Sequence, residues 1–382
     1  MKKAFIISLG CEDRLKIIKK VLQNQYSCRI FISDFDRAKK QYITKKDPEC
    51  EYIHVPEYKK NLSVGRINAY RVFANKVDEL LKLENPDLVY IMLPPNYIAY
   101  KCALYREKHE QSKLIVDVYD LWPESFPIQK ASKYFPLIIT KWKKYRSRTL
   151  NAADFIFTEC RYYRKVIGSG LITDSKTAVL YIHKDQTDSV RQIVKDSIDS
   201  HRKEKDKITF GYLGSINNII DIEGIKDLVQ KIVKEHIKVT VEIIGGGEGT
   251  EHFVSALLDA GACVNNHGFI FDEIEKAEIL TNCDFGLNMM IGHLVVGLTT
   301  KSVDYFSLGL PIVNTIKEDT EKLVTDRNIG VNYTGDISQI IEMDTETIRE
   351  MKISSYQCYQ DLMTSKGLYI TVHDALNENG II

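Results

Sequence analysis

Residues 297–313 read Gly-Leu-Thr-Thr-Lys-Ser-Val-Asp-Tyr-Phe-Ser-Leu-Gly-Leu-Pro-Ile-Val, which predicts a turn, a short helix, a glycine stop and a buried strand. Gly297, Thr299 and Thr300 would offer backbone N–H groups to a phosphate at the start of the helix. Lys301 lies in the first helical turn, and Asp304 follows three residues later on the same helical face. A cation beside a phosphate and a carboxylate beside a ribose diol would together bind a nucleoside diphosphate. An ordinary connection between a helix and a strand has the same pattern.

The composition is that of a globular protein large enough for two domains. The chain has 382 residues, of which 44% are hydrophobic and 27% are charged, and this length exceeds one ordinary core. The 52 basic residues balance 52 acidic ones, which gives no argument for a nucleic-acid partner. Met1–Gly10 predicts a buried strand rather than a signal peptide, and no apolar run is long enough to span a membrane. Eight scattered cysteines without zinc spacing indicate reduced thiols and a cytoplasmic protein.

Short apolar runs alternate with helical patterns, which predicts parallel sheets covered by helices on both faces. One series of strands extends from Lys3–Leu9, through Leu88–Leu93 and Phe155–Thr158, to Ala178–Ile182, and a second from Lys207–Leu213 to Pro311–Asn314. The stretch between them is polar and rich in charge. The sequence therefore predicts an N-terminal Rossmann-like domain over 1–183, a linker over 184–206 and a second Rossmann-like domain over 207–350.

The 297–313 stretch resembles the nucleotide-binding element of retaining glycosyltransferases of family 4, with the approximate pattern E-G-x-x-x-P-x-x-E-Y-x-x-x-G-x-P-V-I. The resemblance implies the α/β fold called GT-B, in which two Rossmann-like domains with parallel sheets face each other across a cleft. It also implies that residues 351–382 form a C-terminal helix that returns to the N-terminal domain. Phe210–Ser215 and Val241–Gly249 resemble two further strands of that family, each ending in glycines, and Gly268-Phe269-Ile270 resembles the family's next strand and helix start. The donor-binding residues implied there are Gly214, Ser215, Gly245 and Gly247, although a tight strand-to-helix turn would also explain the first pair.

The chain departs from the family pattern at two places. Many members carry an arginine and a lysine shortly after the first of these strands, whereas residues 216–220 here contain no cation. Lys301 would therefore neutralise the diphosphate alone. The first glutamate of the family's E-x7-E pattern is replaced by Val296, which cannot hydrogen-bond a sugar. The donor sugar would instead contact His293 or the backbone N–H groups of Gly297 and Leu298.

Residues 117–125 read Asp-Val-Tyr-Asp-Leu-Trp-Pro-Glu-Ser and follow a predicted strand. They resemble the D-x-R-D-L-W-P-E-S stretch of a bacterial subgroup of family 4 that builds surface polysaccharides such as capsule and O-antigen. The resemblance implies an acceptor site that contains Asp120, Trp122 and Glu124, with Asp120 orienting or deprotonating the acceptor hydroxyl. Gly10, after the first strand, would let the acceptor approach. An N-cap aspartate beneath a packed Trp-Pro pair is the alternative.

Residues 130–148 carry seven basic side chains interleaved with aromatic ones. Such a helix can rest on an anionic membrane surface, which suits an acceptor linked to polyprenyl diphosphate. A merely solvated helix is the alternative.

Together these features predict a retaining, hexosyltransferase-type glycosyltransferase of polysaccharide biosynthesis, cytoplasmic and peripheral on the inner face of the membrane. Asp120 and Lys301 are the predicted catalytic residues, and the diphosphate released by the donor would be stabilised by Lys301 and nearby backbone N–H groups. The partners would be a nucleotide-sugar donor and a saccharide acceptor, with no cofactor, no metal and no nucleic acid. Two alternatives remain open: a non-catalytic partner of a glycosyltransferase and a nucleotide-sugar epimerase of the same architecture.

Overall fold

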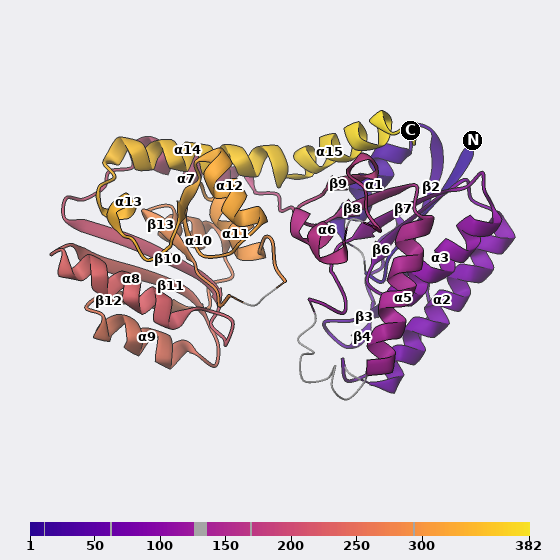
Figure 1. Ribbon diagram of the computed structural model, residues 1–382, viewed down its shortest axis with the longest axis horizontal. Coiled ribbons are helices and arrows are strands. Elements are labelled where there is room, and N and C mark those ends of the chain that lie inside the picture. The colour runs from indigo at the N-terminus through magenta and orange to yellow at the C-terminus, as the bar shows by residue number, and fades with distance from the viewer. Residues whose placement is uncertain (11, 62, 126–135, 169, 293–294) are drawn as a thin grey trace. The chain divides into compact units, whose positions relative to one another are not determined.

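The chain divides into two compact units (Figure 1). The computed structural model describes residues 1–382 except 11, 62, 126–135, 169 and 293–294. The first unit comprises Met1–Tyr181 and Leu368–Ile382, and the second comprises Ile182–Gly367. The chain therefore enters the second unit once and returns to the first at its C-terminal end.

A seven-stranded parallel sheet forms the centre of the first unit, in the order β5-β2-β1-β6-β7-β8-β9. The strands are β1 (Lys2–Ile7), β2 (Tyr26–Ser33), β5 (Cys50–Ile53), β6 (Leu88–Leu93), β7 (Lys113–Val118), β8 (Phe155–Thr158) and β9 (Thr177–Val179), and a separate hairpin pairs β3 (Phe35–Asp36) with β4 (Gln41–Tyr42). Every residue of β6 and β8 is buried, as expected for strands covered on both faces. The predicted bounds of these two strands are confirmed.

Helices cover both faces of the first sheet (Figure 1). They are α1 (Asp13–Leu22), α2 (Val64–Glu84), α3 (Asn96–Lys108), α5 (Pro136–Ala152), α6 (Arg161–Ile167) and α15 (Ser365–Glu378), with a 3-10 turn at Asp174–Lys176. Helices α2, α3 and α5 pack beside one another. Helix α2 begins where Ser63 accepts a hydrogen bond from Arg66 N and ends at Asn85, which is in the left-handed conformation.

The second unit has a six-stranded parallel sheet in the order β12-β11-β10-β13-β14-β15. The strands are β10 (Lys207–Ser215), β11 (Lys238–Gly246), β12 (Cys263–Gly268), β13 (Phe285–Asn288), β14 (Ile312–Asn314) and β15 (Gly330–Asn332). This is the doubly wound order, in which the strand sequence reverses direction on either side of β10. Ligands of such sheets bind at the carboxyl ends of the strands beside that reversal, which places the candidate site between the ends of β10 and β13.

Helices also cover both faces of the second sheet. Figure 1 shows α8 and α9 on one face and α7, α10, α11 and α14 on the other. The helices are α7 (Asp188–Ser200), α8 (Ile222–Lys234), α9 (Thr250–Asp259), α10 (Glu273–Leu280), α11 (Thr300–Ser307), α12 (Asp319–Arg327), α13 (Ser338–Ile341) and α14 (Thr345–Leu362). Helix α7 occupies most of the predicted linker and buries Val190, Val194 and Ile198.

Two helices stand where the sequence predicted one helix over 351–382. Helix α14 places Ile348 and Met351 in the apolar core of the second unit. Helix α15 places Leu368, Val372 and Leu376 in the core of the first unit. The apolar face of α14 therefore packs in one core and the apolar face of α15 in the other, and the two helices are separate.

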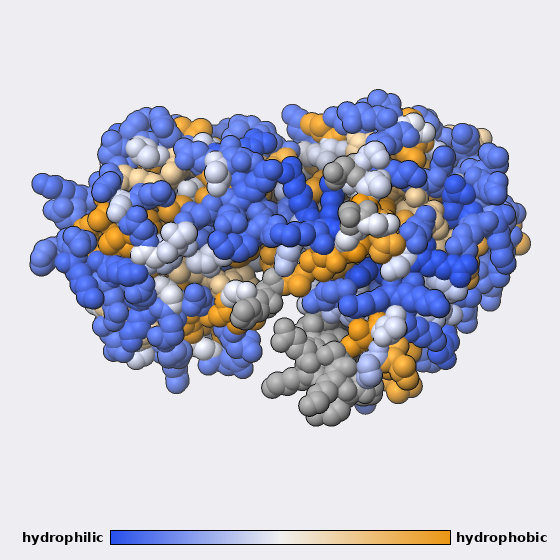
Figure 2. All heavy atoms as spheres, in the orientation of Figure 1, coloured by the Kyte–Doolittle hydropathy of each residue, from blue (hydrophilic) through white to orange (hydrophobic). Residues whose placement is uncertain are grey.

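The face of the molecule drawn in Figure 2 is covered largely by hydrophilic side chains. Among the helices that the structure describes, each is too short or too polar to cross a membrane.

Candidate functional site

Helix α11 stands at the carboxyl edge of the second sheet and carries the two charged residues singled out in the sequence. Thr299 caps its N-terminus, because its hydroxyl accepts a hydrogen bond from Ser302 N at 3.0 Å. The hydroxyl of Ser302 is also bonded to Thr299 Oγ1 at 2.8 Å and reaches Asn288 Oδ1, at the end of β13, at 3.4 Å. The start of α11 is thereby fixed against the end of a core strand.

Tyr305 fixes the same helix from its buried side. Its hydroxyl accepts a hydrogen bond from Leu213 N at 2.9 Å and lies 3.2 Å from the carbonyl oxygen of Leu287. One side chain of α11 thus bonds to both β10 and β13. The sequence did not predict this role. In a short amphipathic helix the position of a tyrosine indicates that the ring is buried, but it does not indicate the partners of the hydroxyl.

The first turn of α11 has backbone donors that remain available. Among the described residues, no acceptor is recorded for the N–H groups of Thr300 and Lys301, as at any helix start. Thr300 itself is exposed. The preceding residues serve the fold, since Gly297 O accepts from Thr320 N and Thr320 Oγ1, and the Leu298 side chain is buried. The helix start is therefore a site where an anion can approach.

Lys301 places a buried ammonium group at this helix start. Its stem is partly exposed, but Nζ is buried and has no hydrogen-bond partner among the described residues. Nζ lies 3.8 Å from the centre of the Tyr212 ring, and a β-carbon on Gly214 would lie 3.7 Å from Lys301 Cε. Burial lowers the pKa of Lys301 to about 7. A bound anion would compensate the positive charge of this buried ammonium group.

The glycines at the ends of β10 and β11 are required by the packing of these two strands. Gly214 and Gly245 are register partners. A β-carbon on Gly245 would lie 2.1 Å from Gly214 O, and one on Gly247 would lie 2.4 Å from Ile216 O. Gly245 and Gly247 thus closely approach the backbone at the end of the neighbouring strand. A contact with the donor stays a prediction for Gly214, Ser215, Gly245 and Gly247.

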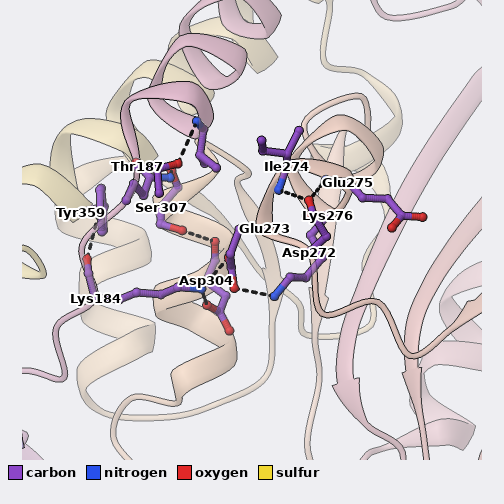
Figure 3. A network of polar contacts seen from close by, with 12 residues as sticks. Lys184, Thr187, Asp272, Glu273, Ile274, Glu275, Lys276, Asp304, Ser307 and Tyr359 are labelled. Atoms are coloured by element: carbon purple, nitrogen blue, oxygen red, sulfur yellow. Dashed lines mark hydrogen bonds and ion pairs between the residues drawn. The ribbon is translucent and has the colours of Figure 1, made fainter.

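Asp304 belongs to a chain of charged side chains (Figure 3). Its Oδ1 lies 2.7 Å from Lys184 Nζ, and the same ammonium lies 3.1 Å from Glu273 Oε2. The other oxygen of Glu273 lies 2.6 Å from Lys276 Nζ. These four residues also line a pocket that reaches Leu213 on β10. Sequence reasoning did not identify Lys184, which it assigned to a linker.

In the first unit, Asp120 follows β7 and binds its own loop. Its Oδ2 accepts a hydrogen bond from Trp122 Nε1 at 2.7 Å, and its Oδ1 accepts one from the Ser125 hydroxyl. Both carboxylate oxygens thus bind side chains of the same loop, whereas an N-cap aspartate would accept from backbone N–H groups. A role for Asp120 with an acceptor hydroxyl stays a prediction, because a carboxylate that accepts two hydrogen bonds can still accept another.

Trp122 and Glu124 connect this loop to α5. Trp122 stacks on Trp142, and the guanidinium of Arg66 lies 4.9 Å from the centre of its ring. Glu124 accepts a hydrogen bond from Arg146 Nη2 at 2.9 Å and lies 3.2 Å from Lys143 Nζ. Burial opposes the ionised form of Glu124, but the Arg146 hydrogen bond and the charges of Arg146 and Lys143 together lower the pKa of this carboxyl. Contact of Trp122 and Glu124 with an acceptor stays a prediction.

Two other acidic residues lie near Asp120, and neither was singled out in the sequence. Asp117, at the end of β7, is fully buried and lies 3.0 Å from Arg14 Nη1, so it serves the core. Glu159 follows β8 and accepts a hydrogen bond from the Tyr163 hydroxyl at 3.1 Å. Burial raises the pKa of Glu159 to about 7, and the charges of Asp120 and Asp117 add to the shift.

Three predictions from the sequence remain, and they concern Gly10, His293 and the basic helix over 130–148. Gly10 is close to Arg37 and Glu12, so a β-carbon there would lie 3.3 Å from Arg37 Nη2. His293 lies outside the described residues, as does the first part of the predicted basic helix. Within the described part, Lys143, Arg146 and Arg148 are paired with Glu124 or Glu107.

Comparison with solved structures finds the same architecture. The structure of HepE from Anabaena in complex with UDP matches with a TM-score of 0.62 and 13% identity, covering 99% of this chain and 100% of that one. The lipopolysaccharide outer core galactosyltransferase WaaB matches with a TM-score of 0.63 and 15% identity, covering 99% of each chain. A protein assigned as a UDP-N-acetylglucosamine 2-epimerase from Listeria monocytogenes matches with a TM-score of 0.54 and 12% identity, covering 100% of this chain and 97% of that one. No family model and no curated protein sequence matches the chain.

The two doubly wound units and these structural matches define the GT-B fold. The fold class predicted from the sequence, α/β with two Rossmann-like domains, is thereby confirmed.

Proposed function

We propose that the protein is a retaining glycosyltransferase that moves a sugar from a nucleoside diphosphate donor to a saccharide acceptor. The donor diphosphate binds the second unit at the start of α11. The acceptor binds the loops of the first unit and is carried on polyprenyl diphosphate during polysaccharide assembly. The protein acts in the cytoplasm at the inner face of the membrane.

Among the described residues, the Lys301 ammonium is buried without a hydrogen-bond partner at a helix start that has two backbone N–H groups with no recorded acceptor, and this observation carries the proposal. Leaving a charged group buried without a partner is costly. A diphosphate supplies charge of the opposite sign and several acceptor oxygens. Because the group lies at the strand reversal of a doubly wound sheet, its position suits a nucleotide.

In the proposed reaction, the bond between the anomeric carbon and the donor diphosphate breaks as negative charge develops on the departing phosphate. Lys301 and the N–H groups of Thr300 and Lys301 stabilise that charge, which accelerates the reaction to the extent that they bind the transition state better than the ground state. The acceptor hydroxyl attacks the same face of the sugar, and its proton passes to the departing diphosphate. Asp120 orients this hydroxyl.

Contact with a membrane is supported by the exposed part of α5. Leu137 is 84% exposed, and Lys141 and Lys144 are exposed. Since three other basic residues of α5 are held in ion pairs, the attraction to an anionic surface rests on few charges.

The test is the thermal stability of the purified full chain with UDP, GDP, dTDP, CMP and NAD. Stabilisation by one nucleoside diphosphate is expected, because a ligand that binds only the folded state raises its stability. The shift should be lost in Lys301→Met and retained in Lys322→Met, which removes the same charge from an exposed ion pair with Asp326. Transfer is then measured with the matching nucleotide sugars. A shift with NAD alone, or with none of the five, contradicts the proposal.

An epimerase is the second candidate, favoured by the structural match to the Listeria protein. An epimerase would convert a nucleotide sugar into its isomer with no acceptor present. A glycosyltransferase would release the nucleoside diphosphate in an acceptor-dependent manner, so product analysis with and without acceptor separates the two.

A further inference from the structure

The segment that enters the second unit contributes a side chain to the pocket beside α11. Lys184 lies two residues after Ile182, where the second unit begins. Its ammonium lies 2.7 Å from Asp304 Oδ1 and 3.1 Å from Glu273 Oε2 (Figure 3). We propose that Lys184 is a positioning residue for nucleoside binding, which fixes the Asp304 carboxylate so that its second oxygen accepts hydrogen bonds from the ribose hydroxyls. This inference rests on the proposed function.

The backbone of Lys184 is held on both sides. Its N–H donates to Met363 O at 3.0 Å, and its carbonyl oxygen accepts from the Tyr359 hydroxyl at 2.8 Å. Two residues later, Gln186 Nε2 donates to Ser307 O at 2.6 Å. The segment thus contacts α11 at Asp304 and again one turn later at Ser307. A lysine fixed in this way can orient a carboxylate rather than merely neutralise it.

The charges of the network leave one oxygen of Asp304 for a ligand. Lys276, Glu273, Lys184 and Asp304 alternate in sign, and each neighbouring pair is bonded. Although burial by itself would lower the pKa of Lys184, Asp304 and Glu273 raise it, so this residue stays protonated at neutral pH. Asp304 Oδ1 faces Lys184, and no partner is recorded for Oδ2 among the described residues. The pocket lined by Asp304 and Leu213 is adjacent.

A fixed carboxylate oxygen would distinguish a ribose from a deoxyribose. A ribose diol offers two hydroxyl donors, and its 2′-deoxy counterpart offers one. A hydrogen bond to a charged acceptor contributes about tenfold or more to binding when the acceptor is already oriented. If Lys184 is removed, the carboxylate can rotate, and part of that discrimination should be lost while the contacts with the diphosphate remain.

The experiment uses calorimetric titration of the full chain with three probes. They are the ribonucleoside diphosphate that binds most tightly in the stability panel, its 2′-deoxy form and inorganic pyrophosphate. The wild type is expected to prefer the ribose form about tenfold. Lys184→Met should reduce this preference to about twofold and change the pyrophosphate affinity by no more than about twofold, whereas Lys184→Arg should retain most of the preference. Lys322→Met is the control for the loss of one positive charge.

The outcomes separate this inference from the proposed function. If the wild type binds no nucleoside diphosphate, the proposed function is wrong and the inference falls with it. If the wild type binds one and Lys184→Met keeps the ribose preference, the role of Lys184 is overturned while the nucleotide site stands. An equal loss of pyrophosphate and nucleotide affinity would also overturn it, because that result indicates a general electrostatic or structural effect. Lys184→Gln, which keeps an N–H donor group but removes the charge, takes the place of Lys184→Met if the latter does not fold.

Discussion

The pH dependence of diphosphate binding is the sharpest test of the site, because the protonation of Lys301 should change when the diphosphate binds. In the free protein the pKa of Lys301 is about 7. A bound diphosphate should restore it toward the ordinary value near 10.5, since an opposite charge favours the protonated form. Binding then takes up a proton whenever the pH lies between these two values. The affinity should therefore fall as the pH rises from 7 to 9, by roughly 50-fold or about 2.3 kcal/mol.

The same pKa predicts an unusual effect on stability. The pKa of Lys301 is lower in the folded chain than in the unfolded one, so the unfolded state binds more protons between about pH 7 and pH 10.5. The stability of the free protein should therefore rise with pH through this window. Because Lys301→Met removes the buried charge, it should stabilise the free protein at pH 7, by an upper limit on the order of 4 kcal/mol. The substitution that abolishes diphosphate binding should thus raise the unfolding temperature.

Both effects are measured on the same samples. Calorimetric titration with the preferred nucleoside diphosphate is run at pH 7, 8 and 9, a range in which the terminal phosphate is largely ionised. Urea unfolding of the free wild type and of Lys301→Met is run at the same three values. A wild-type affinity that changes less than about threefold over this range would contradict the titration of a buried Lys301. A Lys301→Met protein that is less stable than wild type at pH 7 would contradict it as well.

Three further substitutions test other parts of the argument. Tyr305→Phe leaves the N–H of half-buried Leu213 without its acceptor, so it should cost about 1–3 kcal/mol in urea unfolding and weaken nucleotide binding. Asp117→Asn leaves the Arg14 guanidinium without its buried counter-ion and should cost about 3–5 kcal/mol in urea unfolding. Glu159 has a raised pKa, so wild-type stability should fall as the pH rises from about 4.5 to about 7. Glu159→Gln should therefore stabilise the protein by roughly 2–3 kcal/mol at pH 8 and much less at pH 5, measured as the difference in unfolding free energy between the two proteins.

The central strands could be predicted from the sequence because apolar runs are the signal that buried strands leave. Strands β6 and β8 are wholly apolar or nearly so and are buried along their lengths. Strand β12 was missed, and the sequence placed a strand at Gly268-Phe269-Ile270 instead. Its residues Cys263–Gly268 are exposed or half-buried at the edge of the sheet, so they have no need to be apolar.

The candidate site was only partly visible in the sequence, for a different reason. The spacing of Lys301 and Asp304 is local and could be deduced from helical periodicity. Their environments are not local, since Lys301 Nζ lies over a ring on β10 and Asp304 pairs with a residue 120 positions away. A lysine in a polar stretch gives no sign of such a partner. Burial of the Lys301 ammonium likewise depends on neighbouring strands that lie far from Lys301 in the sequence. Their positions around this side chain could not be deduced from the sequence.

The two charged residues of α11 therefore differ in what a ligand can gain from each. Lys301 has no acceptor among the described residues, so a bound phosphate acquires a whole ion pair that the free protein lacks. Asp304 already has Lys184, so a ribose gains only hydrogen bonds to a carboxylate whose charge is balanced. A charge that is unpaired before binding contributes more affinity than a charge that is already paired. It follows that the diphosphate should supply most of the affinity and the ribose most of the selectivity, and that pyrophosphate alone should compete for the site more effectively than an uncharged nucleoside.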